Sequence, residues 1–270
     1  MTYPSGKQVT YTFDAVGRIA GASVAAGTSA QLVSSVTYHP FGGLAGFTFG
    51  ASGPAYSRTQ DLDGRVSSYT LGATTYNLTY DDAGNVTRLS DPANTAQDKV
   101  FAYDKVDRLL SLATSPTTLN QSFTYDKVGN RLTRVLNGAS TSYTMATTSN
   151  RLSAVAGVAR TYDFAGNQTA NGTSALTYDD RGRLTGASTP VGTVTFAVNG
   201  LGQRVKKVVG TVATHFAYDL EGRLIGEYDS TGQPIQETAW LADTPIATIR
   251  PNGTAFDVYY VINAHFKLTP

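Results

Sequence analysis

The chain repeats one short motif, in which an aromatic residue is followed by Asp, two variable residues, Gly, Arg or Asn, and an aliphatic residue. Clear copies are Tyr80–Val86, Tyr178–Leu184 and Tyr218–Leu224. A recurring motif of this kind constrains the fold more than any single residue, because it indicates one structural unit that stacks on its neighbours. The anchor positions of the 12 copies are Phe13, Tyr38, Tyr80, Tyr103, Tyr125, Tyr162, Tyr178, Tyr218 and Tyr228, with Gln60, Met145 and Val198 in the remaining three.

The motif is typical of the turn of a β-hairpin. Asp at the first position of a type I turn can accept hydrogen bonds from the backbone N–H groups two and three residues on. Gly at the fourth position suits the left-handed conformation of a three-residue loop with a bulge, and Asp107 replaces it in one copy. The aromatic and aliphatic residues then face each other across the strand pair. The predicted structural turn residues are Asp14, Gly17, Asp81, Gly84, Asp104, Asp126, Gly129, Asp163, Gly166, Asp179, Gly182, Asp219 and Gly222.

The number of hairpins predicts the architecture. Twelve hairpins contain about 24 strands, which would extend roughly 115 Å as a flat sheet. Open twisted sheets rarely exceed about 10 strands without curling or splitting. We therefore expect an all-β fold in which consecutive hairpins form one long, coiled antiparallel sheet. Residues 1–270 are expected to form a single domain of about 12 hairpin units, with an irregular tail at 263–270.

Composition excludes several classes of protein. The net charge is +1 and the chain has no cysteine, so we expect no nucleic-acid partner, no disulfide framework and no thiol chemistry. No apolar run is long enough to span a bilayer. Residues 1–6 lack the features of a signal peptide, so export would need another signal or an upstream segment.

The repeated motif resembles that of the RHS-repeat, or YD-repeat, proteins, which include bacterial Rhs polymorphic toxins, C components of insecticidal toxin complexes and teneurins. The resemblance covers nearly the whole chain, including Trp240–Ala247 near its end. It implies a large β-sheet wall that spirals into a hollow shell, and in toxins the shell encloses an effector. It also implies a secreted or cell-surface bacterial location.

The resemblance stops after Tyr260. Family members continue with an Asp-His-Leu-Gly-Thr-Pro sequence and a core segment whose Asp residues carry self-cleavage. This chain reads differently from Ile262 to Pro270, so the self-cleavage residues and an effector have no counterpart. The sequence leaves open whether the chain is a natural short protein, a gene remnant or an excised piece.

The sequence supports catalytic, metal-binding and glycan-binding roles less well than it supports a structural role. The turn Asp residues could form a catalytic or calcium-binding array, but a recurring residue at a recurring turn favours a structural role. The three histidines, His39, His215 and His265, lack metal-ligand spacing. We expect no catalytic residues, no cofactor and no metal. Eight of the 16 tyrosines are repeat anchors, and aromatic residues beside Asn, Asp and Arg leave glycan binding open.

The sequence thus favours a non-enzymatic structural segment of an RHS-type shell that encapsulates or presents a toxin or effector. Its partners would be that effector or the remainder of a larger shell. The alternative is a carbohydrate- or cell-surface-binding module, and an enzyme with an unrecognised site is a third class. We also expect the two terminal strands to expose unpaired backbone groups. That exposure predicts self-association through the sheet edges, or a cover made by the chain ends, above all by residues 263–270.

Overall fold

The structure is a computed structural model that describes residues 1–261 apart from residues 27, 41 and 116. The predicted tail at 263–270 lies outside the described residues. Two 3₁₀ turns are present, η1 at Thr95–Gln97 and η2 at Thr117–Leu119. The strands are β1 Gln8–Phe13, β2 Ile19–Ala26, β3 Thr28–Tyr38, β4 Leu44–Phe49, β5 Ala55–Gln60, β6 Val66–Leu71, β7 Thr74–Tyr80, β8 Val86–Ser90, β9 Lys99–Tyr103, β10 Leu109–Thr114, β11 Gln121–Tyr125, β12 Arg131–Leu136, β13 Ala139–Met145, β14 Leu152–Val155, β15 Val158–Tyr162, β16 Gln168–Asn171, β17 Ser174–Tyr178, β18 Leu184–Thr189, β19 Gly192–Val198, β20 Arg204–Val209, β21 Val212–Tyr218, β22 Leu224–Tyr228, β23 Pro234–Leu241, β24 Thr244–Asn252 and β25 Ala255–Tyr260.

These 25 strands form one antiparallel sheet in which each strand pairs with the next along the chain. The predicted fold class, a run of hairpins in a single coiled sheet, is confirmed. The anchor residue pairs with the residue six positions on, as in Tyr80 with Val86 and Tyr178 with Leu184. A bulge precedes each of these pairs, because the register shifts by one residue at the turn.

The two faces of the wall differ in chemistry. In β11, Phe123 and Tyr125 are half-buried on one face, while Ser122 and Thr124 are exposed on the other. This alternation is the period of a strand, and it recurs along the wall. On the hydroxyl-rich face, Thr and Ser side chains from paired strands contact each other within 3.2 Å, for example in the pairs Thr79–Thr87, Thr124–Thr133, Thr161–Thr169 and Thr177–Thr185.

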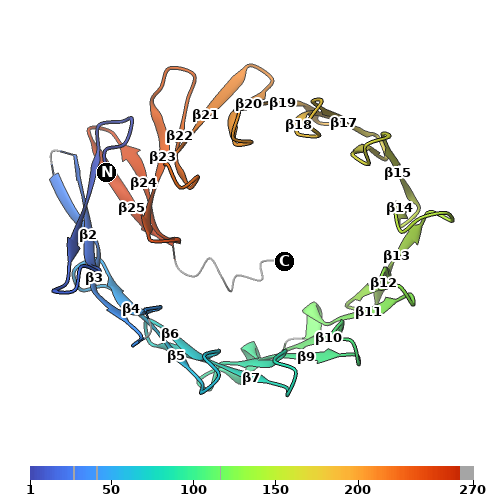
Figure 1. The fold of residues 1–270 in the computed structure, drawn as a ribbon, viewed down its shortest axis with the longest axis horizontal. Coiled ribbons are helices and arrows are strands. Elements are labelled where there is room, and N and C mark those ends of the chain that lie inside the picture. The colour runs from blue at the N-terminus through green and yellow to red at the C-terminus, as the bar shows by residue number, and fades with distance from the viewer. Residues whose placement is uncertain (27, 41, 116, 262–270) are drawn as a thin grey trace.

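The sheet curls into a ring whose first and last hairpins lie side by side (Figure 1). Strands β24 and β25 contact β3 there, although no backbone ladder joins the two ends in the part of the chain that the structure describes. We call this junction of β1–β4 with β22–β25 the seam. The ring is therefore closed by side chains.

The hydrophobic core lies at the seam. Its buried apolar residues come from β1–β4 and β22–β24 and the segment before β1. Between β5 and β21 the buried apolar residues of the described chain are only Tyr69, Leu78 and Phe216. A single sheet has no second layer to cover its apolar face, so deep burial occurs where the ends of the sheet pack together.

One end of the chain covers part of a sheet edge, as one of the two sequence expectations has it. Residues 1–7 fold back along the free edge of β1, where the Val9 N–H donates to the Met1 carbonyl at 2.9 Å. The N-terminal segment thus covers part of one edge. The expected cover by residues 263–270 lies outside the described residues.

Candidate functional site

The motif turns form a regular array along one rim of the wall. Eleven of the 12 motif turns link an odd-numbered strand to the following even-numbered strand, so they lie at the same edge of the meander. The turn between β23 and β24 lies at this edge too. We call this edge the motif rim. The twelfth turn, Asp229–Gly232, links β22 to β23 and therefore lies at the opposite rim.

The motif turns that begin with Asp are built on its side chain. Asp14 donates its backbone N–H to the Arg18 carbonyl at 2.8 Å and accepts the Gly17 N–H on its own carbonyl. Its Oδ1 accepts the N–H groups of Val16 and Arg18, and its Oδ2 accepts the Arg18 Nε–H at 2.9 Å. The carboxylate thus binds residues two and four positions on. The sequence interpretation, which named residues two and three positions on, was wrong about the second donor, because the bulge turns the fifth residue's N–H inward.

The same arrangement holds in the other predicted turns. Asp81, Asp104, Asp126, Asp163, Asp179 and Asp219 each accept the backbone N–H and a side-chain N–H of the Arg or Asn four positions on. The predicted glycines all have left-handed backbone: Gly17, Gly84, Gly129, Gly166, Gly182 and Gly222 have φ between 73° and 94°. Asp107, which replaces Gly in one copy, has φ 61°.

The hydrogen bonds hold the turn carboxylates in the ionised form. The pKa values of Asp14, Asp81 and Asp179 lie below the ordinary value of 3.8, chiefly because a backbone N–H four residues on donates to each. In Asp126 and Asp163 the side-chain amide of Asn130 or Asn167 is the main cause of the lowered pKa. These carboxylates serve their own turns, which is the structural role of the motif.

The anchor tyrosines join each hairpin to the one before it. Tyr178 donates its hydroxyl to the Gln168 carbonyl at 2.9 Å, and Gln168 is the residue opposite the preceding anchor. The same bond is made by Tyr38, Tyr80, Tyr103, Tyr125, Tyr162 and Tyr218, and Trp240 makes it with its indole N–H. The anchor Phe13 has no hydroxyl and is exposed. Sequence reasoning expected the anchors only to stack, and it missed this bond.

The motif Arg and Asn residues make a second connection between neighbouring hairpins. The Arg108 guanidinium donates to the Asp126 carbonyl of the next turn and lies 4.9 Å from the centre of the Tyr125 ring. Similar cation–π contacts pair Arg18 with Tyr38, Arg65 with Tyr80 and Arg151 with Tyr162. The array thus ties successive hairpins together by side chains as well as by the sheet ladder.

At the seam, tyrosine hydroxyls reach across the ends of the sheet. Tyr3 donates to the Thr238 carbonyl at 2.9 Å, and Tyr11 donates to the Trp240 carbonyl at 2.8 Å. Tyr260 donates to the Gln31 carbonyl at 3.2 Å. These residues are about 230 positions apart in sequence, so each bond fixes one end of the wall against the other.

A buried charge pair lies at the centre of the seam. Glu237 is fully buried, and its Oε2 lies 3.2 Å from the Lys7 Nζ. Glu237 also accepts the Ser5 hydroxyl at 2.8 Å and the Tyr228 hydroxyl at 2.7 Å. Burial, and then the hydrogen bond to Glu237, raises the pKa of Tyr228, so its hydroxyl stays a donor. The anchor Tyr228 therefore serves the seam instead of a neighbouring hairpin.

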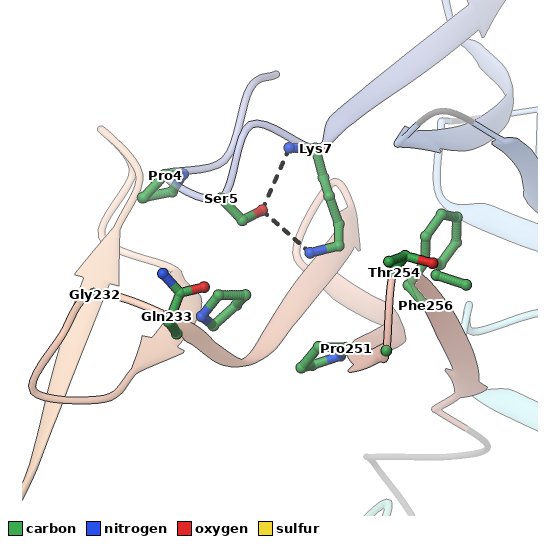
Figure 2. Close-up of a pocket in the computed structure, with 11 residues that line it drawn as sticks. Pro4, Ser5, Lys7, Gly232, Gln233, Pro251, Thr254 and Phe256 are labelled. Atoms are coloured by element: carbon green, nitrogen blue, oxygen red, sulfur yellow. Dashed lines mark hydrogen bonds between the residues drawn. The ribbon is translucent and has the colours of Figure 1, made fainter.

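Figure 2 shows the pocket beside this cluster, with the Ser5 hydroxyl between the backbone N–H and the Nζ of Lys7. The pocket has a volume of about 390 Å³ and lies between the segment before β1 and the last hairpins. Pro251 and Phe256 line its other side. Because Lys7 is already paired with Glu237, the pocket offers no free cation to a ligand.

Sequence reasoning missed the seam residues Lys7 and Glu237. One signal was present, since Glu237 falls in phase with Ala239 and Leu241 in β23, and all three are buried. A charged residue in the apolar phase of a strand indicates a buried partner.

Among the residues of 1–261 that the structure describes, no group of three His, Asp or Glu residues is placed to hold a metal ion. No helix among those residues is long and apolar enough to cross a bilayer.

Comparison with known proteins supports the fold. No protein-family model matches the chain, and neither does any curated protein. Solved structures do match. The Tc holotoxin pore of Photorhabdus luminescens with mutated TccC3 is 16% identical over 93% of this chain, with a TM-score of 0.69. The TcdB2–TccC3 complex without its hypervariable C-terminal region is 16% identical over 92% of this chain, with a TM-score of 0.68. A further structure of TcdB2–TccC3 is 15% identical over 94% of this chain, with a TM-score of 0.64.

These matches establish that the chain shares the fold of the toxin-complex proteins, as the RHS resemblance implied. The chain covers only 14% to 18% of the length of the three matched chains. At this identity the likeness concerns the fold, so activity and partners do not follow from it.

Proposed function

We propose, from the premise that this chain shares the fold of TcdB2–TccC3 toxin-complex proteins, that it forms a segment of a hollow shell that holds a polypeptide cargo. The observation that carries the proposal is the closed ring of a single sheet (Figure 1). A wall of this kind satisfies its backbone internally and separates what it encloses from the surroundings.

The proposed role needs no catalysis by this chain. The turn carboxylates are bonded within their own turns, and the buried Glu237 is bonded to Lys7, Ser5 and Tyr228. These groups therefore serve structure, which supports a non-enzymatic wall. We propose the rest of a larger shell, or an enclosed effector, as the partner, and secretion from a bacterium as its setting.

Containment can be tested by co-expressing the chain with the polypeptide encoded directly downstream. We expect the two to copurify and the polypeptide to resist added protease. In the Lys7→Glu variant two carboxylates meet at the seam, so the ring should open and protease should cut the cargo. Gly200→Ala is the control, because Gly200 lacks the left-handed φ and a methyl group there meets no atom within 4 Å.

The proposal fails if the two chains never copurify, or if the cargo is cut equally fast with the wild-type wall and with the Lys7→Glu variant. If the cargo is also cut with the Gly200→Ala control, the cleavage does not depend on opening of the seam. That result would count against containment by the closed ring.

The glycan-binding alternative stays a prediction. A pocket of about 370 Å³ on the wall is lined in part by Tyr125, Arg131 and Tyr143. The Arg131 guanidinium lies 4.2 Å from the centre of the Tyr143 ring and so occupies one face of the ring that a sugar would use.

A further inference from the structure

The motif rim carries a series of exposed apolar side chains. Among the residues that the structure describes, the two variable residues of the motif turns are exposed, and in seven turns one of them is a large apolar residue. Leu62, Phe164 and Leu220 are fully exposed. Single exposed apolar residues are ordinary, but here they recur at equivalent places along one rim. The seven are Val16, Leu62, Val106, Val128, Phe164, Leu201 and Leu220.

The spacing of these side chains defines what could cover them. Successive motif turns are two strands apart, which is about 10 Å. A surface that matches many such positions at once must have the same repeat. The rim of another wall of this kind meets that requirement.

Charges at the same turns identify the partner as a second copy. Counting turns from the N-terminus, the third and fourth carry exposed acidic residues, Asp63 and Asp82, and the fifth and sixth carry exposed basic residues, Lys105 and Lys127. Among the described residues, Asp82, Lys105 and Lys127 make no ion pair, whereas Asp63 lies 3.0 Å from Arg65. At its variable positions one arc of the rim is thus acidic and the next is basic, while Asp107 of the fifth turn accepts the Asn85 side-chain amide.

We propose that two copies associate rim to rim about a two-fold axis that passes between the fourth and fifth motif turns. This symmetry reverses the order of the turns, so the fourth turn meets the fifth and the third meets the sixth. Asp82 then faces Lys105 of the second copy, and Asp63 faces Lys127. Each contact occurs twice in the dimer.

The apolar residues match in the same register. Leu62 of the third turn faces the sixth turn, which carries Val128. The first turn faces the eighth, so Val16 meets Phe164. One register thus satisfies charge and apolar contact together.

Neighbouring registers are less favourable, because each keeps only one of the two opposite-charge pairings and adds a like-charge contact on the axis. An axis through the fourth turn brings Asp82 against its own copy, and an axis through the fifth brings Lys105 against its own copy. Like charges in direct contact disfavour an interface. The rim sequence therefore favours one arrangement, in which the motif rims of two rings are in contact and the two rings enclose a longer chamber. This association goes beyond the proposed containment role and does not depend on a cargo.

Analytical ultracentrifugation of four proteins tests the dimer. We expect the wild-type chain to dimerise, and both K105E/K127E and D63K/D82K to dissociate at least about tenfold more readily, since each places like charges together. A mixture of the two variants should form a heterodimer of wild-type affinity, because every charged contact is then again between opposite charges. R160E, on a strand that begins at the opposite rim, is the control and should dimerise normally.

A monomeric wild-type chain would overturn the inference and leave the rim to another occupant, such as a further turn of a longer wall. A dimer that both double variants leave intact would also overturn it and would indicate association through the sheet edges. Failure of the mixed variants to associate, with each one folded by circular dichroism, would reject the two-fold register.

Discussion

At the scale of the residue, the Asp and Gly positions of the motif turn have different roles. The Asp side chain organises the backbone of the loop, as Asp179 does by accepting the N–H groups of Arg181 and Arg183. The Gly allows the left-handed conformation that completes the loop. Asn199 fills the Asp position in one turn with the same two backbone bonds, so acceptance of hydrogen bonds matters more than charge there.

The glycine position gives the first prediction. Gly84→Val and Gly222→Val should each destabilise the wall by about 1–2 kcal/mol, because a β-branched residue is strained at positive φ. Gly84 and Gly222 have φ +87° and +84°, and neither has backbone within 4 Å of an added Cβ. Urea unfolding measures the effect. Gly200→Ala is the matched control, and equal midpoints for the control and both valine variants would contradict the turn assignment.

The turn carboxylates give a pH prediction. Their pKa values in the folded state lie below the ordinary 3.8, so the stability they contribute is full above that value and is lost as the pH falls through the folded-state pKa. We expect the urea midpoint to fall progressively below about pH 5. The D14N/D81N/D179N variant should show a shallower acid dependence, since an amide keeps the backbone bonds without titrating. The same slope in both proteins would contradict the assignment.

At the scale of the element, seven hairpins are joined to the one before by a tyrosine hydroxyl, and several are also joined by an arginine. In a wall with little deep burial, these side-chain bonds add to the sheet ladder. Their acceptors are backbone carbonyls 10 to 19 residues earlier in the chain. The hydroxyl therefore acts between repeats, whereas the Asp and Gly act within one.

Removal of a single anchor hydroxyl tests this role. Tyr178→Phe should cost about 1 kcal/mol, because the Gln168 carbonyl loses its donor. Tyr143→Phe is the control, since among the described residues the Tyr143 hydroxyl has no hydrogen-bond partner. Chemical denaturation and hydrogen exchange in β16–β18 would report the difference. Equal losses in both variants would show that the hydroxyl bond does not join the hairpins.

The sequence predicts the local features of the fold but not the contacts between its hairpins or between its ends. The hairpins, the turn residues and the coiled sheet follow from local chemistry, because Asp, Gly and the anchor act within seven residues. The hydrogen bonds from the anchor tyrosine hydroxyls cannot be predicted from the sequence. Their acceptors are backbone carbonyls, which have no sequence signature, and the spacing of the copies varies. The seam cannot be predicted either, because Lys7 and Glu237 meet only after every intervening strand has added its curvature.

At the scale of the whole molecule, the seam converts an open sheet into a ring. The core lies there, and the Lys7–Glu237 pair lies within it. A buried charge that loses its partner is strongly unfavourable, so the pair makes closure specific to one alignment of the two ends.

Lys7→Met should therefore loosen the ring and cost about 3 kcal/mol, whereas the K7M/E237Q double variant should recover part of the loss. The chain has no cysteine, so spin labels can be introduced at the exposed positions Thr10 and Ile235. We expect a broadened distance distribution in Lys7→Met and an unchanged one in Arg88→Gln, which breaks an ion pair with Asp98 away from the seam and the motif rim. An unchanged distribution in Lys7→Met would exclude the pair as the closing contact.

The meander also determines how such a chain can acquire its structure. Every strand pairs with its neighbour in sequence, so hairpins can form one after another during synthesis with short loop closures. The contact between Tyr3 and Thr238 spans 235 residues and can form only after nearly the whole chain has emerged from the ribosome. Closure of the wall is therefore the last step of folding, and a cargo of the proposed kind could lie along the open sheet until this contact is made.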